Sequence, residues 1–248
     1  KTPTFSVLYQ GQDDYIGGAG IVSLHLRAAG ARVTFTTLLG DDTLKEFVIS
    51  GMKDSGVEIM PIIDPNRPTT QKNAIISEGY RLLKIDKLDN SPVSDEILEE
   101  LVEKVKQTPA NAIVFSDFRH GIFNRMSVKR LTQAIPKGIY RVADSQVASR
   151  WGNITEFKNF DLITPNEREA RFALGDQDST VSHLANELCE VSNYKNIILK
   201  LGDKGVFSYT PAEGSNDMYA FSIGSFVDNV VDPVGAGDAL LAYSTLVQ

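Results

Sequence analysis

Apolar residues recur at two different spacings along this chain, and the alternation between the two spacings predicts the fold class. Helical spacing predicts helices at about 19–29, 44–53, 94–105, 124–135, 167–174 and 180–191. Short apolar runs predict strands at about 33–39, 57–63, 112–115, 140–143, 161–163 and 196–199. Because strands that alternate with helices form parallel sheets covered on both faces, we predict an α/β fold. It would be a three-layer, doubly wound, mostly parallel sheet with helices on both faces.

Residues 71–86 depart from this alternation. Two β-like runs, 71–77 and 80–86, flank Glu78 and Gly79, which is the pattern of a β-hairpin. A hairpin between βα units does not fit a parallel sheet. We therefore place it in a small β-sheet lid, which we expect also to use residues 5–9 and 57–63.

The C-terminal stretch 231–238 carries the candidate chemistry. Gly235, Ala236, Gly237 and Asp238 precede an uncharged run, 239–247, that predicts a buried helix. The unpaired N–H groups and the dipole of a helix start form an anion site, and glycines let a ligand approach the backbone. A carboxylate beside that site can accept the proton of a hydroxyl during phosphoryl transfer. The alternative is that Asp238 only caps the helix.

Neither of two common nucleotide-binding motifs explains this stretch. A dinucleotide-binding fingerprint is disfavoured because Leu240 stands where a third glycine would fall. No P-loop motif occurs anywhere in the sequence, which excludes a Walker-type NTPase.

Polar residues follow four of the predicted strands at the point where each strand ends. They are Asp117, Asp144, Asn166 and Lys200. Open α/β sheets bind ligands at the carboxyl ends of their strands, so we predict a ligand site at this edge.

Three features of this edge are each open to two interpretations. Glu169 can close a capping box with Asn166, or hold a Mg²⁺ ion through water. The segment 202–205 can be a hairpin turn or a nucleotide contact, and Lys200 can be solvated or pair with a triphosphate.

Composition narrows the class of protein and the set of partners. The 248 residues are 42% hydrophobic and 23% charged, which is ordinary for a soluble globular protein. The net charge of −7 argues against a nucleic-acid or anionic membrane partner. The single cysteine, Cys189, is expected in the core, and the three histidines lie far apart in sequence with no metal-ligand spacing. We find no transmembrane run or signal peptide and expect a cytoplasmic protein.

Several motifs together resemble the ribokinase-like (PfkB) carbohydrate kinases. Residues 232–238 resemble the catalytic signature of that family, and residues 17–19, 29–33 and 39–42 resemble its N-terminal, sugar-side signature. Residues 166–169 match its Asn-x-x-Glu element, and residues 200–205 occupy its nucleotide-side turn. Within the family, residues 67–72, 82–86 and 116–121 are most similar to the heptose 7-phosphate kinases of ADP-heptose synthesis.

The resemblance implies a function, a set of ligands and an assembly. It implies a phosphotransferase that moves the γ-phosphoryl group of ATP to a hydroxyl of a sugar or sugar phosphate, such as a heptose 7-phosphate. ATP, Mg²⁺ and, as a further candidate, a monovalent cation are the implied cofactors. It also implies a homodimer that pairs through the β lid.

The resemblance also assigns roles to residues. Asp238 is the implied general base, and the N–H groups of Gly235, Ala236 and Gly237 are the implied anion hole. The implied sugar-side residues are Gly17, Gly18, Lys72, Asp117, His120 and Asp144. The implied nucleotide-side residues are Asn166, Glu169, Lys200, Gly202 and Gly205, with Glu169 binding Mg²⁺ through water.

Three positions depart from the family pattern. Ile21 stands where the sugar-side signature has Asn, and His120 and Gln146 stand where the branch has Lys. The last two changes remove fixed positive charge from the expected acceptor side. The three departures leave open a non-catalytic sugar- or nucleotide-binding regulator on the same scaffold. A nucleoside kinase of the same family is a separate alternative, which the similarity of the lid to heptose kinases disfavours.

The family pattern also predicts the domain organisation. We expect residues 1–248 to form one PfkB-type kinase domain that lacks the family's first strand and C-terminal end. Lid segments are expected at about 1–15 and 57–88.

Overall fold

A computed structural model describes residues 6–146, 153–211 and 218–246 of the chain. Its α-helices are α1 (Ala19–Ala28), α2 (Thr43–Asp54), α3 (Asp95–Gln107), α4 (Arg125–Ala134), α5 (Glu167–Leu174), α6 (Val181–Ser192) and α7 (Ala236–Leu246). Its first strands are β1 (Thr34–Phe35), β2 (Leu38–Gly40), β3 (Glu58–Ile59), β4 (Ile62–Asp64), β5 (Gln71–Ser77) and β6 (Tyr80–Lys87). The others are β7 (Ala112–Asp117), β8 (Tyr140–Ser145), β9 (Leu162–Ile163), β10 (Asn196–Lys200), β11 (Val206–Pro211) and β12 (Met218–Ile223). Two short 3₁₀ turns are η1 (Ile154–Glu156) and η2 (Gly202–Lys204).

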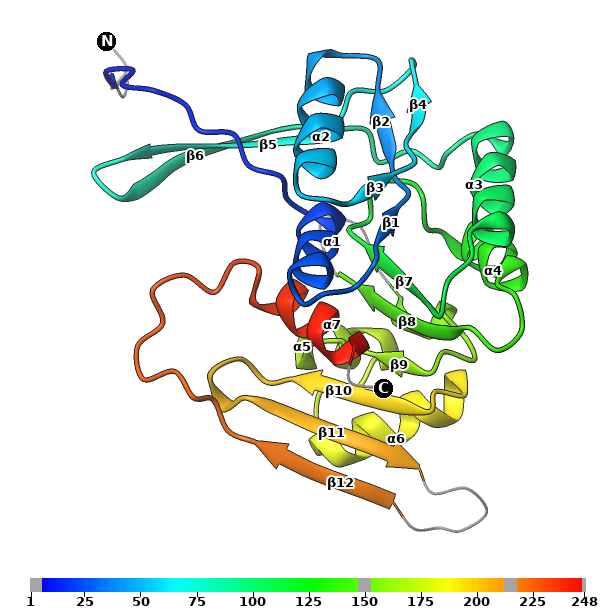
Figure 1. The fold of residues 1–248 in the computed structure, drawn as a ribbon. Coiled ribbons are helices and arrows are strands. Elements are labelled where there is room, and N and C mark those ends of the chain that lie inside the picture. The colour runs from blue at the N-terminus through cyan, green and yellow to red at the C-terminus, as the bar shows by residue number, and fades with distance from the viewer. Residues whose placement is uncertain (1–5, 147–152, 212–217, 247–248) are drawn as a thin grey trace.

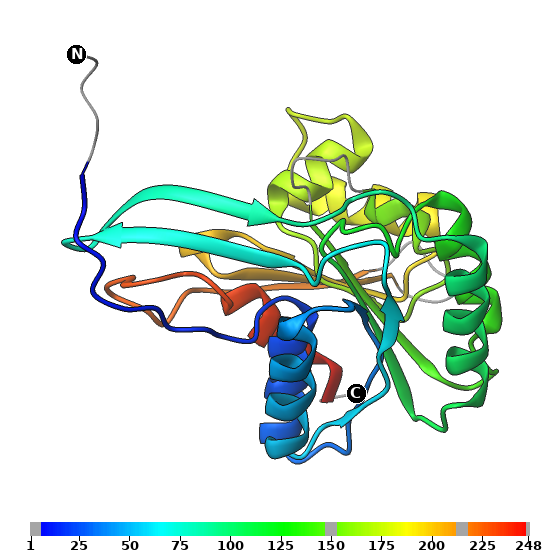
Figure 2. The ribbon, with the colours of Figure 1, turned by 90° about the horizontal axis from the view of Figure 1, so that it is seen from above.

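The largest sheet has six strands in the order β12-β11-β10-β9-β8-β7. Strands β7 to β10 are parallel, whereas β11 and β12 run antiparallel to their neighbours. Helices α3 to α6 cover one face of this sheet, and α1 and α7 cover part of the other (Figure 2). The structure therefore confirms the predicted ribokinase-like α/β class with a mostly parallel sheet.

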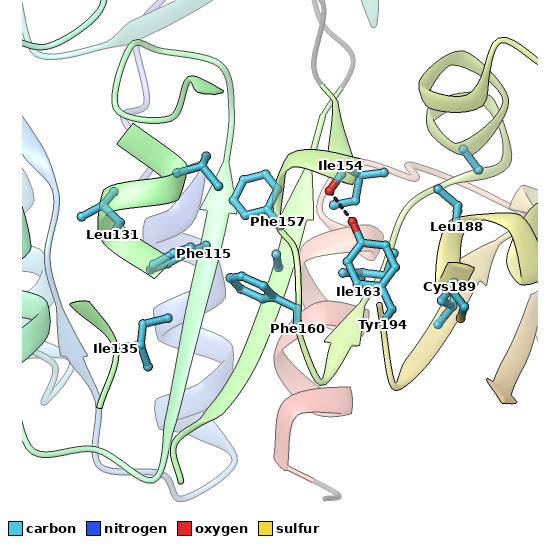
Figure 3. Packing of buried hydrophobic residues seen from close by; sticks show 14 of the residues in the cluster. Phe115, Leu131, Ile135, Ile154, Phe157, Phe160, Ile163, Leu188, Cys189 and Tyr194 are labelled. Carbon is cyan, nitrogen blue, oxygen red and sulfur yellow. Dashed lines mark hydrogen bonds between the residues drawn. The ribbon is translucent and has the colours of Figure 1, made fainter. Parts of the chain in front are cut away.

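Alternating residues of the parallel strands build two cores, one on each face of the sheet. Ala143 and Ile163 pack in the core beneath α3 to α6, while Val142 and Leu162 pack against α1 and α7. This is the period of two that a strand buried on both faces requires. The larger core contains an aromatic cluster in which the rings of Phe157 and Phe160 meet edge to face at 5.7 Å (Figure 3).

Capping residues fix the starts of several helices where the sequence predicted them. The side chains of Ser94, Asn124 and Thr180 accept backbone N–H groups in the first turns of α3, α4 and α6. Gly175, with a φ of 68°, ends α5 in the left-handed conformation. Cys189 of α6 is buried in the core, as predicted. In the described ranges, no helix is both long and apolar enough to span a membrane.

The two predicted strands at 33–39 and 57–63 are each divided in the structure. β1 pairs with β3 and β2 pairs with β4, both in parallel, and the break falls around Pro61, which has no N–H to donate. These strands belong to neither the six-stranded sheet nor the hairpin, so the expected contribution of 57–63 to the lid sheet is wrong.

The lid sheet is smaller than the sequence suggested. β5 and β6 form a two-stranded antiparallel hairpin with an irregularity at Ile75 and Ile76. Residues 6–9 form no strand, which corrects the second expected contribution, and Phe5 lies outside the described residues. The hairpin projects from the body of the molecule on the same side as the loop 224–235 (Figures 1 and 2).

Two further differences concern the C-terminal third. Strands β11 and β12, which pair in antiparallel orientation, were not predicted. The helix expected at 239–247 starts earlier, at Ala236, and is only half-buried. Its Leu241 is fully buried, whereas Tyr243 is 47% exposed, so the expectation of a wholly buried helix is wrong.

Candidate active site

The register of the parallel strands brings the polar strand ends to one edge of the sheet. Asp117 of β7 pairs with Ser145 of β8, the residue after Asp144. Asn166, just beyond β9, forms a parallel bridge with Lys200 at the end of β10. The expectation that these residues share one edge is therefore confirmed.

A charged cluster lies where this edge meets the start of α7. The Lys200 Nζ donates to the Asp144 Oδ1 at 3.0 Å, and the Thr164 hydroxyl donates to the same oxygen at 3.1 Å. Asp144 is buried, and its side chain is 6% exposed against 17% for Lys200. The interpretation of Lys200 as simply solvated is wrong, because its ammonium group is held in a partly buried ion pair with Asp144.

Asp238 lies within electrostatic reach of this ion pair. Burial raises the pKa of the Asp238 carboxyl above its usual range, and the neighbouring Asp144 carboxylate raises it further. Lys200 and His25 act in the opposite direction and favour the ionised form. A half-buried carboxylate whose pKa is raised binds a proton more tightly than a free aspartate, which suits a general base.

The glycine-rich turn shapes the backbone before Asp238. Gly235 has a φ of 83°, which a glycine adopts without strain, and the Asp232 carboxylate accepts the Val234 N–H at 2.9 Å. Because α7 starts at Ala236, the N–H groups of its first turn have no carbonyl partner within the helix. The Ala236 N–H nevertheless donates to the Pro233 carbonyl at 3.2 Å, so one of the three implied anion-hole donors is already engaged.

Gly237 lies next to the ion pair. A Cβ atom at Gly237 would lie 3.4 Å from the Lys200 Nζ. The start of α7 and the ammonium group therefore face the same small region, which combines partial positive charge with one full positive charge. Such a region favours an anion, while Asp238 supplies a proton acceptor at its border.

The Asn166 and Glu169 pair forms the capping box of α5. The Asn166 Oδ1 accepts the Glu169 N–H at 2.8 Å, and a Glu169 carboxylate oxygen accepts the Asn166 N–H at 2.7 Å. The capping interpretation of these two residues is therefore confirmed. Glu169 is also buried, at 6% exposure, on the edge of the sheet that carries the charged cluster.

The segment 202–205 is the turn of the β10–β11 hairpin, as one of its two interpretations predicted. At Gly205 a Cβ atom would lie 2.0 Å from the Ile223 carbonyl oxygen, so the approach of β12 requires glycine there. Gly202 has a φ of 65°, and a Cβ atom there would meet no neighbouring atom. This residue lines a cavity.

This cavity, of about 900 Å³, opens beside α5. It is lined by Asn153, Asn166, Glu167, Arg168, Arg171, Phe172, Ala173, Gly175, Gln177, Lys200, Leu201 and Gly202. Three of the implied nucleotide-side residues, Asn166, Lys200 and Gly202, thus share one cavity wall.

The N-terminal glycines meet the end of β7. Gly18 precedes α1 with a φ of 57°, and a Cβ atom there would lie 3.8 Å from the ring of Phe118. Gly17 has open space around it. The implied sugar-side loop therefore lies against the segment that follows Asp117.

Asp117 is more deeply engaged than the sequence suggested. It is buried and accepts hydrogen bonds from the Arg119 N–H at 2.7 Å, the Arg119 guanidinium at 2.8 Å and the Ser145 hydroxyl at 2.9 Å. Arg119 adopts a φ of 62°, an uncommon conformation for a non-glycine residue that Asp117 helps to hold. Burial raises the pKa of the Asp117 carboxyl despite these donors. Asp117 therefore positions Arg119, a residue that the sequence analysis did not single out.

His120 lies under the inner face of the β5–β6 hairpin. Its Nδ1 is 2.8 Å from the Asn90 side-chain oxygen, and Lys72, Lys84 and Asp86 of the hairpin act on its charge. Burial, followed by Lys72, lowers the pKa of His120 to about 4, so the ring is neutral near pH 7. The same two causes, burial and a neighbouring lysine, lower the pKa of Lys72.

Arg67 borders the same region from the other side. A Cβ atom at Gly121 would lie 3.0 Å from the Arg67 guanidinium, which pairs with Asp64 at 2.7 Å. Lys84 pairs with Asp86 at 3.3 Å and Arg67 with Asp64, so each of these two cations already has an acid partner, and sequence reasoning missed both as site residues. Their signal was present in the motifs 67–72 and 82–86, but only the hairpin pairing shows that these motifs meet.

Known proteins match this arrangement over nearly the whole chain. The profile of the pfkB family carbohydrate kinases matches residues 9–243. The bifunctional protein HldE of Bradyrhizobium diazoefficiens is 26% identical over 98% of this chain and 49% of that protein. The chain therefore spans about half the length of the curated relatives that it matches.

Solved structures match the fold. Escherichia coli phosphofructokinase-2 in complex with fructose-6-phosphate superimposes with a TM-score of 0.72 at 17% identity, over 93% of this chain and 74% of that chain. Ribokinase from Giardia lamblia superimposes with a TM-score of 0.69 at 17% identity, over 90% of this chain and 68% of that chain.

Proposed function

Because the chain belongs to the pfkB family of carbohydrate kinases, we propose that it transfers the γ-phosphoryl group of ATP to a hydroxyl of a phosphorylated sugar. Asp238 beside the Asp144–Lys200 pair, at the start of α7, is the observation that carries this proposal. The heptose phosphates are the preferred acceptor class, since HldE is among the relatives and heptose 7-phosphate kinases share the lid motifs.

The proposed reaction uses Asp238 as the general base. Its carboxylate takes the proton of the acceptor hydroxyl, the hydroxyl oxygen bonds to the γ-phosphorus, and the bond from that phosphorus to the β–γ bridging oxygen breaks, which releases ADP. In the proposed reaction, the Lys200 ammonium and the Gly237 N–H at the start of α7 stabilise negative charge on the phosphoryl oxygens, whereas the Ala236 N–H already donates to the Pro233 carbonyl. Asp144 keeps Lys200 in place through the 3.0 Å ion pair.

The residues present also suit a Mg²⁺ ion, whose role is to neutralise phosphate charge. Mg²⁺ prefers carboxylate oxygens and water, and the buried carboxylate of Glu169 is bonded to Asn166, which bridges to Lys200 at the strand edge. Its capping bond to the Asn166 N–H fixes the orientation of that carboxylate. We propose that Glu169 holds the ion through a water molecule and that the cavity beside Asn166, Lys200 and Gly202 takes the nucleotide.

Positive charge beneath the hairpin supports a phosphorylated acceptor. Lys72 and Lys84 lie on the face of the hairpin that overlies His120, and the Arg67 guanidinium reaches the neighbouring Gly121. Lys84 and Arg67 are paired with Asp86 and Asp64, so Lys72 is the cation of this group that we propose binds the phosphate of the acceptor. Lys72 would offset part of the charge lost where His120 and Gln146 replace lysines of the family pattern.

An acceptor panel tests this function. With ATP, Mg²⁺ and K⁺ present, we expect ADP release with heptose and hexose phosphates and much less with adenosine or unphosphorylated sugars. Replacing Lys72 by Met should raise KM for the phosphorylated acceptor about tenfold or more, because a hydrogen bond to a charged group contributes roughly 1.5–3 kcal/mol.

Lys87→Gln is the matched control for the acceptor panel. Lys87 follows Asp86 on β6, so its side chain points to the opposite face of the hairpin from Asp86. Its replacement should therefore leave KM unchanged. ADP release only with adenosine would assign a nucleoside kinase. Ligand-induced stabilisation without any ADP release would assign a non-catalytic binding protein.

We also propose that two copies of the chain pair through the outer face of the hairpin. Leu83 and Ile85 on this face are 52% and 48% exposed, and an isolated two-stranded hairpin is only marginally stable in water. Both outer edges of the hairpin lack a partner strand among the described residues. A second hairpin would cover the apolar face and satisfy one edge.

Light scattering after gel filtration tests this dimer. Replacing Leu83 by Lys should convert a dimer to a monomer, because a charge would be buried in the apolar contact. Phe221→Lys is the control, since Phe221 is 56% exposed on the edge strand β12, far from the hairpin in sequence. A wild-type monomer, or a dimer that Phe221→Lys disrupts and Leu83→Lys does not, would contradict the pairing.

A further inference from the structure

A group of metal-binding side chains lies outside the candidate active site, where the loop after α5 meets α6. It consists of Asp176 in the loop and of His183 and Glu187 on α6. One ligand atom from each of the three residues lies within 4.8 Å of the other two. Spacing between histidines does not reveal this group, because two of its three members are carboxylates.

The local structure holds these three side chains in place. The Asp176 Oδ1 accepts the N–H groups of Asp178 and Ser179 at 2.9 Å and 3.0 Å, which fixes the carboxylate over the start of α6. His183 and Glu187 are one helical turn apart and therefore point to the same side, with 3.8 Å between the His183 Nε2 and the Glu187 Oε2.

We propose that Asp176, His183 and Glu187 bind a divalent transition-metal ion of the zinc class. In a tetrahedral zinc site with bonds of about 2.0–2.2 Å, neighbouring ligand atoms are roughly 3.4 Å apart. The 3.8 Å between His183 and Glu187 and the upper limit of 4.8 Å for the group both exceed that value, so side-chain rotations must draw the ligand atoms together around the ion. Water supplies the fourth ligand. An imidazole nitrogen with two carboxylates favours zinc over magnesium, which prefers oxygen ligands alone.

The ion would join the loop after α5 to the body of α6. Gly175 and Gln177, on either side of Asp176, both line the cavity of about 900 Å³ that also contains Lys200 and Gly202. Binding at Asp176 therefore stabilises one wall of that cavity. Without an ion, His183 and Glu187 form only an exposed pair, with side chains 59% and 37% exposed, which contributes little to stability.

Calorimetric titration of the full chain with Zn²⁺, in excess Mg²⁺, tests the site directly. We expect one ion per chain with a dissociation constant in the micromolar range, a rise in Tm, and visible absorption bands of a low-symmetry site when Co²⁺ replaces Zn²⁺. His183→Ala and Glu187→Gln should each weaken binding by at least about tenfold, since each removes one of three protein ligands. Both positions are on the surface, so circular dichroism should report an unchanged fold.

Asp178→Asn is the matched control for the zinc titration. It removes one negative charge from the same loop, but the Asp178 side chain is not part of the cluster and only its backbone N–H contacts Asp176. Its affinity for Zn²⁺ should equal that of the wild type. The proposal is overturned if the wild type binds no Zn²⁺ at about 1 mM, or if His183→Ala or Glu187→Gln binds as tightly as the wild type.

Discussion

Replacing Asp238 by Asn is expected to remove ADP production while ATP binding is retained. Asn has nearly the same shape but cannot accept the hydroxyl proton, and a positioned base typically contributes about 10²–10⁴-fold to the rate. The nucleotide contacts proposed for Asn166, Lys200 and Gly202 do not involve this side chain. Turnover is measured by a coupled ADP assay, and nucleotide binding by calorimetry on the same protein.

The wild-type pH profile gives a second readout of the same residue. Because burial and Asp144 raise the pKa of Asp238, and because only the ionised form accepts a proton, the rate should rise with pH through a midpoint above the usual range of an aspartate. Asp228→Asn, an exposed change in the preceding loop, is the control and should keep full activity and the same profile. Undiminished turnover in Asp238→Asn would remove the assignment of the base.

Local patterns in the sequence predicted most elements because the forces that define them act over a few residues. Ser94, Asn124 and Thr180 start helices through bonds to N–H groups two or three residues away. Polar residues at strand ends identified one edge of the sheet, because parallel strands carry all their carboxyl ends to the same side.

The features that sequence could not predict depend on contacts between distant segments. From the sequence alone, Lys200 resembles a surface lysine. In the fold, β10 places it against Asp144, which is 56 residues away in the sequence. The strand expected at 57–63 divides because its two halves pair with β1 and β2, which are themselves separate. The Arg119 guanidinium is held by the buried carboxylate of Asp117. The sequence does not show this contact, because the burial of Asp117 depends on the assembled core.

The charge of the acceptor region illustrates the same limit. From the sequence, His120 and Gln146 replace lysines of the family pattern, and the region loses charge. In the folded chain, the hairpin carries Lys72 and Lys84 over His120. The charge of a site depends on which segments the fold brings together, and here the hairpin brings Asp86, paired with Lys84, as well as the two lysines.

Replacing Lys200 by Met is expected to lower both stability and activity. It would leave the Asp144 carboxylate buried without its ion partner, which costs about 3 kcal/mol by comparison with other broken buried pairs. Lys200 also favours the ionised form of Asp238, so its loss should raise the pKa of that carboxyl and move the acid limb of the rate profile to higher pH. Urea unfolding and pH–rate profiles measure the two effects.

Lys195→Met is the matched control, because Lys195 makes a similar 2.7 Å pair with Asp161, but the Lys195 side chain is 71% exposed and the Asp161 side chain 14%. An ion pair with one partner open to solvent contributes under about 1 kcal/mol, so the control should unfold almost as the wild type does. Adding Asp144→Asn to Lys200→Met should recover part of the lost stability, since no buried charge is then left without a partner. Asp144→Asn alone should move the acid limb to lower pH, because that carboxylate raises the pKa of Asp238. If Lys200→Met is as stable as Lys195→Met and its acid limb does not move, the ion pair neither supports the strand edge nor tunes the base, and the proposed charge arrangement is wrong.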